Sequence, residues 1–428
     1  MSTKVLIITY YWPPAGGPGV QRWLKFVKYL PEFGIAPIVY CPENPNYPIL
    51  DESLVNEIPE DIIILKQPIN EPYDLASVFS KGKSKKISSG VIPKAKKQSL
   101  TEKAMLYVRG NYFIPDARKN WINPSVHFLT NYIKEHQIET IITTGPPHSL
   151  HLIGLQLNAK LDVKWLADFR DPWTTIGYHK DLKLTAASKA KHLDLEQKVL
   201  NSADEIIVTS YHTKNEFQTK SKRTITVITN GYDSHNISIA KKDRLFTVSH
   251  IGSLLSERNP EVLWETLSEL IEENADFAAV FKLQLVGVVS DDVISSIHNY
   301  RLKNHLEVVG YVSHDEAIKF QMRSQLLLLI EIDSEDTKAI IPGKVFEYLI
   351  SETPILAIGP KNADVEQIIN STNTGTYFNY HQKESLKTQL LHYFEAFQNN
   401  ALKVNAIGLK PYSRKALTEK LAKLILRS

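Results

Sequence analysis

Lys344 and Glu347 are the charged side chains whose spacing most readily suggests chemistry on a bound ligand. They lie in Ile340–Pro360, IIPGKVFEYLISETPILAIGP, where apolar residues recur at helical spacing from Val345 to Ile350. Residues three apart share one helix face, so both groups would project near the helix start. A lysine beside the free N–H groups of a helix start suits phosphate, and a carboxylate one turn on suits a pair of sugar hydroxyls. A solvated Lys–Glu pair on an amphipathic helix would show the same spacing.

Two aspartates flank an arginine directly after the predicted strand Val163–Ala167. Asp168, Arg170 and Asp171 belong to the run DFRDPW. In open α/β sheets ligands bind beyond the carboxyl ends of the strands, which is where this run would lie. The arginine should lower the pKa of a neighbouring carboxyl. The run predicts either an ion-pair cluster that fixes the loop or a site in which one aspartate contacts a ligand and the other supports it.

Another predicted strand, Thr140–Thr144, is followed by GPPHS, in which His148 is the residue that could do chemistry. This histidine would also lie at the carboxyl end of a strand. A single histidine in such a loop is more often structural, and the sequence leaves both interpretations open. The segment Asn111–Trp121, NYFIPDARKNW, is dense in aromatic and charged residues, but its pattern alone names no chemistry.

The chain begins with a strand, a glycine-rich loop and a helix. The strand is Lys4–Thr9, the loop is Tyr10–Gly19 (YYWPPAGGPG) and the helix is Val20–Leu30. This order is the start of a nucleotide-binding βα unit. Gly17 and Gly19 would let the backbone approach a ligand closely. A tight turn of small residues would explain them equally well.

The same order recurs in the second half of the chain. The strand Leu245–Ile251 is followed by Gly252 and Ser253, then by a helix from Pro260 that Asn259 should cap. Other short apolar runs that a parallel sheet would bury are Ala36–Cys41, Asp61–Leu65, Asp204–Thr209, Thr224–Ile228, Phe281–Val286, Leu306–Val309, Gln325–Ile330 and Ile355–Ile358. Strands that alternate with helices predict an α/β chain with two doubly wound sheets.

The composition agrees with two domains and excludes several classes of protein. The chain has 428 residues, of which 43% are hydrophobic. Its net charge of +3 is too small to indicate a nucleic-acid partner. The single cysteine, Cys41, excludes a disulfide framework and fits a reducing compartment. Val5–Ile8 is too short for a signal peptide and no run approaches the ~20 apolar residues of a spanning helix, so we expect a cytoplasmic protein.

At Gly343–Leu349 and Pro354–Ala357 the chain resembles GT-B glycosyltransferases. The likeness is to the retaining, family-4-like group that makes cell-surface polysaccharides and lipid-linked glycans. In that group a glutamate at the place of Glu347 holds the ribose of the nucleotide-sugar. It is usually the second of two glutamates at a fixed spacing, and the first place is Ala339 here. This departure affects the contacts that the family makes to the donor sugar.

The resemblance implies a set of donor-binding residues, namely Gly17, Gly19, Asn230, Ser253, Arg258, Lys344 and Glu347. Arg258 and Lys344 would pair with the donor diphosphate, and two cations can neutralise such a leaving group without a metal. Asn230 lies in a turn like the one that precedes the interdomain linker of the family. Arg22, at the start of the first helix, either adds a charge near the glycine loop or is a surface arginine.

The resemblance also implies where catalysis would occur. Family members place a site residue at the strand end that DFRDPW occupies here. Asp171 or Asp168 would therefore contact the reacting sugar or orient the acceptor hydroxyl, and His148 is the third catalytic candidate. The segment Asn111–Trp121 looks like one in the same subgroup, for which acceptor binding is the suggested role.

The implied fold is GT-B, with two doubly wound Rossmann-like domains that face each other across a cleft. Residues 1–233 would form the acceptor-side domain, and the C-terminal helix, 412–428, would pack back on it. Residues 245–411 would bind the nucleotide-sugar, and the polar stretch between the domains would be a linker. No metal or other cofactor is expected, and we do not interpret the DxD-like pattern in Glu331–Asp336 as a metal site.

The expected reaction is transfer of a sugar from a nucleotide-diphosphate-sugar to a glycan or lipid-linked acceptor. Two alternatives are a nucleotide-sugar epimerase of the same fold and a catalytically silent nucleotide-sugar-binding protein, which Ala339 would favour. The lysines of Lys81–Lys103 predict either a solvated surface loop or peripheral contact with an anionic membrane on the inner face. A nucleic-acid partner is not expected.

Overall fold

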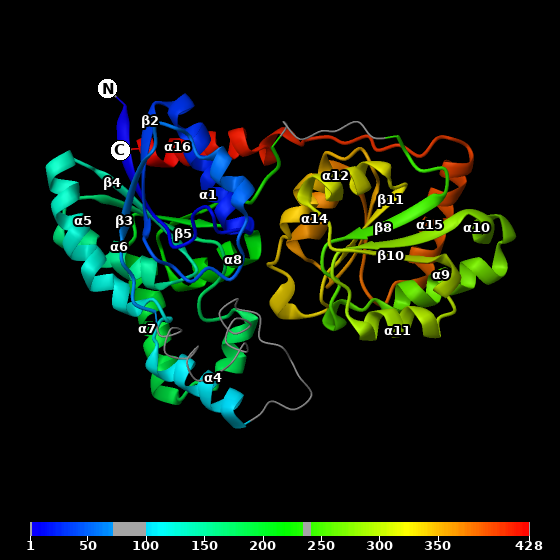
Figure 1. Ribbon diagram of the computed structural model, residues 1–428, viewed down its shortest axis with the longest axis horizontal. Helices are drawn as coiled ribbons and strands as arrows, with labels where there is room; N and C mark the ends of the chain where they lie inside the picture. Colours follow the sequence, from blue (N-terminus) through cyan, green and yellow to red (C-terminus); the bar gives the residue numbers. More distant parts are fainter. Residues whose placement is uncertain (1, 72–99, 234–240, 428) are drawn as a thin grey trace. The chain divides into compact units, whose positions relative to one another are not determined.

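The chain divides into two compact units, which are described separately below (Figure 1). A computed structural model describes residues 2–71, 100–233 and 241–427. The first unit contains residues 1–230 and 414–428, and the second contains residues 231–413. Most of the basic stretch Lys81–Lys103 lies outside the described residues, as does most of the predicted linker.

The first unit is built on a seven-stranded parallel sheet with the order β3-β2-β1-β4-β5-β6-β7. Each of the strands predicted in this part of the chain is present, with ends that shift by one or two residues. The bounds are β1 Thr3–Ile8, β2 Ile35–Pro42, β3 Ile63–Gln67, β4 Thr140–Gly145, β5 Lys164–Phe169, β6 Glu205–Val208 and β7 Thr224–Val227.

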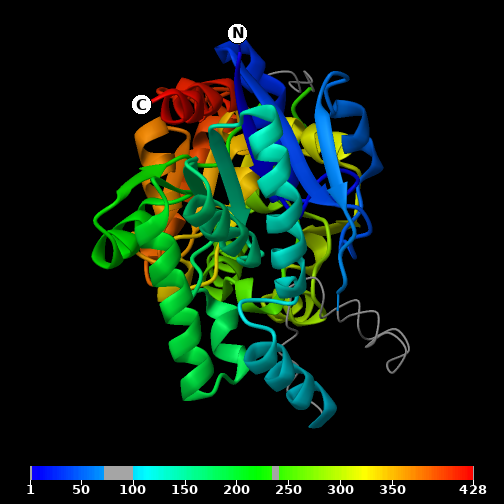
Figure 2. The ribbon, with the colours of Figure 1, turned by 90° about the vertical axis from the view of Figure 1, so that its left-hand side faces the viewer.

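Helices cover both faces of this sheet, which explains why its strands are continuous apolar runs. The helices are α1 Pro18–Tyr29, α4 Leu100–Tyr112, α5 Ile122–His136, α6 Ser149–Lys160, α7 Ala186–Ser202, α8 Tyr211–Lys220 and α16 Arg414–Leu426. Leu6 and Ile8 of β1 pack in one core with α5, α6 and α7, and Val5 and Ile7 pack in a second core with α1 and α16. Figure 2 shows α5, in teal, in front of the blue strands. The C-terminal helix α16 therefore belongs to the first unit, where it lies beside α1 (Figure 1).

The second unit has a six-stranded parallel sheet with the order β10-β9-β8-β11-β12-β13. Its strands are β8 Phe246–Ile251, β9 Phe281–Val286, β10 Leu306–Gly310, β11 Leu326–Ile330, β12 Ile355–Ile358 and β13 Gly375–Phe378. Its helices are α9 Glu261–Glu273, α10 Ala275–Val280, α11 Asp291–Asn299, α12 His314–Arg323, α13 Gly343–Leu349, α14 Asp364–Thr372 and α15 Lys383–Gln398. Both faces are again covered by apolar cores. The predicted fold class, two doubly wound parallel sheets, is confirmed.

Each sheet has one point at which the strand order reverses. In the first unit this point lies between β1 and β4, and in the second it lies between β8 and β11. Ligands of open α/β sheets bind beyond the carboxyl ends of the strands at such a point. The loops after these four strands carry the glycine loop, His148, Ser253 and Glu331. The fold therefore selects two places in which to look for chemistry.

Two local features differ from, or add to, what the pattern predicts. The cap of α9 is Pro260, because the side chain of Asn259 instead accepts a hydrogen bond from Trp264 Nε1 at 2.7 Å. The prediction that Asn259 caps this helix is therefore wrong. Among the helices in the described parts of the chain, none is long and apolar enough to cross a membrane.

Candidate functional site

Lys344 lies at the start of α13 in the second unit, beside the loop that follows β8. Its Nζ is 3.4 Å from Nε2 of His250, and a Cβ on Gly252 would lie 3.0 Å from the same Nζ. Nδ1 of His250 is 3.2 Å from the Leu328 carbonyl oxygen, so Nδ1 carries the proton and Nε2 accepts from the ammonium. Burial lowers the pKa of Lys344 to about 8. Burial, and then the nearby ammonium, lowers the pKa of His250 well below its usual range.

Arg258 contributes a second cation to the same place. Its Nη2 lies 3.4 Å from Oε2 of Glu331, the first residue after β11, whose side chain is only 3% exposed. Burial raises the pKa of the Glu331 carboxyl, and Arg258 and Lys344 act against that shift. The site therefore holds two cations and one buried carboxylate, with a histidine that stays neutral. Glu331 did not stand out in the sequence as a donor-site residue, although its place directly after an inner strand is a usable signal.

Glu347, one turn further along α13, is partly exposed. Its Oε2 accepts a hydrogen bond of 2.9 Å from Nε2 of Gln321, a buried residue of α12. Its Oε1 lies 3.9 Å from Nε2 of His314. One carboxylate oxygen is thus held in place while the other faces a half-exposed imidazole. This arrangement can present an oxygen to a hydroxyl of a bound ligand.

The remaining donor-binding candidates are divided between the two units. Ser253 is exposed and follows Gly252, so it lies with Lys344 and Arg258 in the second unit. Gly17, Gly19 and Asn230 belong to the first unit. Oδ1 of Asn230 is buried and has no hydrogen-bond partner among the described residues. The structure therefore assembles only part of the predicted donor set in one unit.

The two glycines of the first loop have different structural roles. Gly17 precedes α1 with a φ of 106°, a conformation that suits glycine, and a Cβ there would meet no atom within 4 Å. Gly19 is needed for a close approach instead, because a Cβ there would overlap the guanidinium of Arg170. That guanidinium also donates to the carbonyl oxygen of Pro146. Gly19 thus lets the DFRDPW loop pack against the glycine loop.

Asp168 is completely buried and already holds several donors. Arg22 donates to it from Nη2 at 2.8 Å, Trp23 from Nε1 at 2.9 Å and Thr144 from Oγ1 at 2.8 Å. Thr144 and Asp168 are also paired across β4 and β5. The carboxylate cannot reach a substrate from this position, so the prediction that Asp168 contacts the reacting sugar is wrong. The surface interpretation of Arg22 is also wrong, because its side chain is 0% exposed.

Asp171 differs from Asp168 in its environment. It is partly exposed, and no hydrogen bond to its carboxylate occurs within the described ranges. Burial raises the pKa of its carboxyl, and Arg170 opposes the shift. Of the two aspartates that the sequence left as alternatives, Asp171 is the one with a carboxylate available to a ligand, and Asp168 is the supporting one.

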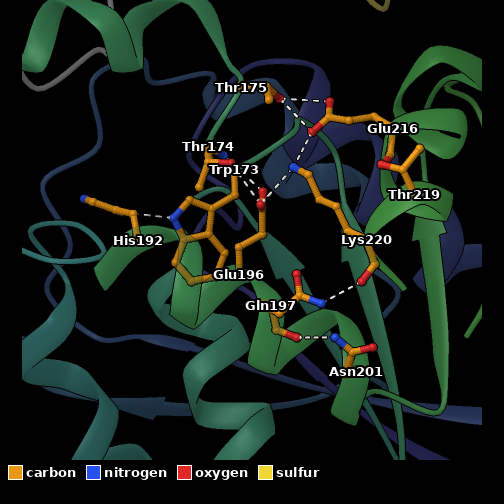
Figure 3. A network of polar contacts seen from close by, with 10 residues as sticks. All are labelled: Trp173, Thr174, Thr175, His192, Glu196, Gln197, Asn201, Glu216, Thr219 and Lys220. Carbon is orange, nitrogen blue, oxygen red and sulfur yellow. Dashed lines mark hydrogen bonds and ion pairs between the residues drawn. The ribbon is translucent and has the colours of Figure 1, made fainter. Parts of the chain in front are cut away.

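The chain after Asp171 is fixed by a polar network that joins α7 and α8 (Figure 3). Trp173 Nε1 donates to Nδ1 of His192 at 3.2 Å, and Thr174 donates to the carboxylate of Glu196 from both its N–H and its hydroxyl. Lys220 lies 2.9 Å from Oε2 of that glutamate. The loop that carries Asp171 is thus anchored on both sides, by Asp168 before it and by this network after it.

His148 follows β4 and is only 4% exposed. Its ring stacks on the indole of Trp173, with centroids 4.7 Å apart and an interplanar angle of 3°. Neither ring nitrogen has a hydrogen-bond partner among the described residues. Burial lowers the pKa of His148 well below its usual range, so the ring is neutral near pH 7. The structure places it at the edge of a pocket in the first unit.

Comparison with known proteins identifies the fold. No protein-family model and no curated protein matches the chain. A glycosyltransferase from Rickettsia africae has a TM-score of 0.61 at 16% identity, with 100% of this chain and 99% of that chain covered. Staphylococcus aureus TarM, in complex with fondaparinux, α-GlcNAc-glycerol and UDP, has a TM-score of 0.58 at 13% identity, with 99% and 100% covered. A protein from Listeria monocytogenes described as a UDP-N-acetylglucosamine 2-epimerase has a TM-score of 0.52 at 12% identity, with 99% and 96% covered.

These similarities extend over whole chains, and together with the two doubly wound sheets they show that the protein has the GT-B fold. The GT-B prediction made from Gly343–Leu349 is confirmed. At identities this low the similarity establishes the fold and not the reaction. The reaction must be argued from the side chains described above.

Proposed function

We propose that this protein is a glycosyltransferase that moves a sugar from a nucleotide-diphosphate-sugar to a glycan or lipid-linked acceptor, with retention of anomeric configuration. The observation that carries the proposal is the pair of cations Arg258 and Lys344 at the strand-order reversal of the second unit. A nearly fixed pair of positive charges suits a diphosphate, whose negative charge grows as the sugar leaves. The UDP bound to TarM, a neighbour of the same fold, is a ligand of this chemical class.

The donor would be held entirely by side chains of the protein. Arg258 and Lys344 bind the diphosphate and stabilise the leaving group, and we propose no metal or other cofactor. Glu347 binds the ribose through the oxygen that Gln321 leaves available. Ser253 adds an exposed hydroxyl in the loop between β8 and η6. The glycine loop and Asn230 belong to the other unit and contact the donor from there.

The acceptor would be bound by the first unit. Asp171 orients or deprotonates the acceptor hydroxyl, since its carboxylate is available and its raised pKa brings it closer to that of a proton acceptor at neutral pH. Asp168 supports the loop without touching substrate. His148, with two nitrogens that have no partner in the described protein, contributes a polar contact.

We also propose that the protein acts at the cytoplasmic face of a membrane. The lysines of Lys81–Lys103 are a sequence feature that supports this location, since each basic residue near an anionic surface contributes roughly 1 kcal/mol. A lipid-linked acceptor would make such attraction useful. Sedimentation with vesicles that contain anionic lipid, compared with neutral vesicles, tests it directly.

Two other functions are distinguished by their products. An epimerase, the activity named for the Listeria neighbour, would convert one nucleotide-sugar into another without any acceptor. A silent binding protein, which Ala339 favours, would bind a nucleotide-sugar without turnover. Incubation with a donor and no acceptor, followed by analysis of the nucleotide-sugar, separates these from a transferase.

The first test is a thermal-shift screen of nucleotide-sugars against the full chain. A ligand present at about 100 times its Kd should stabilise the protein by ~2.7 kcal/mol. We expect one diphosphosugar to raise the Tm, and we expect Lys344→Ala and Glu347→Ala to abolish that rise. Lys303→Ala, which changes an exposed lysine before β10, is the matched control and should keep it. A shift that persists in the Lys344 and Glu347 variants, or no shift with any donor, would contradict the proposed site.

A further inference from the structure

Three segments that are distant in the sequence meet in one pocket of the first unit. The pocket is lined by Phe113 and Asp116 from the segment after α4, by His148 after β4, and by Trp173 and His192. It encloses about 460 Å³ together with the solvent at its mouth. This is the low end of the range of about 300–1,000 Å³ for small-molecule sites. The volume suits one small ring and not an extended chain.

The imidazole of His148 is the clearest sign that the pocket has a ligand. Stacking on Trp173 fixes the plane of the ring, and Trp173 is itself held by its hydrogen bond to His192. The ring is 4% exposed, yet neither nitrogen is paired within the described chain. Buried polar groups nearly always have a partner, so these nitrogens point to a molecule that the pocket receives.

The charges around the pocket favour a neutral ligand over an anionic one. Burial lowers the pKa values of His148, His179 and His192, so these rings are neutral near pH 7. The carboxylate of Asp116 is already used, because it accepts from the N–H and the hydroxyl of Ser149. Arg109 also lines the pocket and has an interaction of its own. A neutral imidazole offers one donor and one acceptor, which matches a hydroxyl group.

We propose that this pocket binds one neutral sugar ring of the acceptor, with His148 exchanging hydrogen bonds with its hydroxyls and Phe113 and Trp173 forming apolar walls. The proposal rests on the function proposed above, because it makes the pocket the acceptor subsite of the same enzyme. It also gives a role to the segment Asn111–Trp121, whose pattern alone named no chemistry. The sugar ring would be recognised by its hydroxyls and not by a charge.

The test is direct binding of simple sugars to the full chain, followed by the ring nitrogen signals of its histidines in ¹⁵N NMR. The probes are the methyl glycosides of glucose, galactose, mannose and N-acetylglucosamine, with inorganic phosphate as the anionic probe. His148→Gln identifies the His148 signals by their loss. His127→Gln, which changes an exposed histidine of α5, is the matched control.

We expect one glycoside to shift the His148 ring signals with a millimolar Kd. His148→Gln and Phe113→Ala should each weaken its binding at least fivefold, and His127→Gln should leave it unchanged. Phe113 is partly exposed, so its variant tests the pocket even if His148→Gln does not fold. No shift with any glycoside, a shift with phosphate alone, or equal binding by the Phe113 variant would overturn the proposal.

Failure of this inference can be told apart from failure of the proposed function. The thermal shift with nucleotide-sugars is measured on the same samples, and it reports on Lys344 and Glu347 in the other unit. Nucleotide-sugar binding without glycoside binding overturns only the pocket assignment. Glycoside binding without nucleotide-sugar binding leaves the pocket as a sugar site and overturns the transferase.

Discussion

Nη2 of Arg22 lies 2.8 Å from Oδ1 of Asp168, and neither side chain is exposed to solvent. Nη1 of the same arginine donates to the carbonyl oxygen of Thr229 at 2.8 Å. The two residues of the ion pair are separated by 146 positions in the chain. One buried pair thus joins the helix after the glycine loop, the end of β5 and the segment after β7. The candidate catalytic loop depends on this junction for its position.

Asp168→Asn should destabilise the protein by about 3–5 kcal/mol, because it leaves the buried guanidinium of Arg22 without a counter-charge. The urea midpoint, followed by circular dichroism, measures the change. Asp162→Asn, which alters an exposed aspartate just before β5, is the control and should shift the midpoint by less than about 0.5 kcal/mol. Equal midpoints for the two variants would show that the buried pair contributes no more than a surface charge.

Asp171→Asn should have the opposite profile. Burial raises the pKa of Asp171, so the charged carboxylate is held at a cost in stability that a neutral amide avoids. We expect the urea midpoint to stay the same or rise, and the transferase rate to fall by about 10²–10⁴-fold if the carboxylate acts as a base. Initial rates at saturating donor and acceptor measure the effect. A rate within a factor of three of wild type would remove Asp171 from the mechanism.

The sequence predicts most of this fold because both sheets are buried on their two faces. Runs such as Ile355–Ile358 are continuous and apolar, and that strand has the bounds predicted for it. The short strand β13, Gly375–Phe378, was not predicted, since only one of its four residues is buried and its composition is mixed. Helix α4 was also missed. It leaves Tyr107 and Val108 exposed, which hides its helical periodicity.

The site was less predictable because its chemistry depends on distant partners. Arg22 has no local feature that reveals a carboxylate 146 residues away, so its burial could not be inferred. Asp168 and Asp171 have similar sequence contexts, and only the structure shows that one is saturated with donors. Lys344 and Glu347 were found because both lie on one short helix, where spacing along the chain implies proximity.

Gly19→Ala should destabilise the first unit by about 1–3 kcal/mol, because the added methyl overlaps the guanidinium of Arg170. The double variant Gly19→Ala/Arg170→Ala should recover part of that loss. Gly17→Ala is the informative control, since its position has open space but a φ of 106°. Its loss of stability should come from backbone strain and should not be relieved by Arg170→Ala. Urea midpoints of the singles and doubles form the two cycles, and equal coupling in both would contradict the steric explanation.

Diphosphate binding should weaken as the pH rises through the pKa of Lys344, which burial lowers to about 8. Below that pH the free protein carries the ammonium that pairs with the ligand. Above it the proton is lost from the free protein and must be taken up again on binding, so affinity should fall by up to tenfold per pH unit. Titration calorimetry with UDP from pH 7 to pH 9 measures the slope. Lys344→Arg stays charged throughout and should give a nearly flat profile; a slope equal to that of wild type would exclude Lys344 as the titrating group.

Glu331→Gln should bind diphosphate more tightly than the wild type. The carboxylate of Glu331 lies 3.4 Å from Nη2 of Arg258 and competes with any anion for that cation. Removing its charge should improve the affinity for inorganic pyrophosphate by about fivefold, which corresponds to ~1 kcal/mol for a partly exposed pair. Glu335→Gln, which alters an 85% exposed glutamate paired with Lys338, should have no effect.

The pH dependence of Glu331→Gln separates this role from a purely structural one. Burial raises the pKa of Glu331, so lowering the pH through that value neutralises the carboxylate and releases Arg258. Wild-type affinity for pyrophosphate should therefore increase toward acid pH relative to that of Glu331→Gln, and the advantage of the variant should disappear there. If the variant binds more weakly at every pH, the carboxylate holds Arg258 in position for the ligand instead of competing with it.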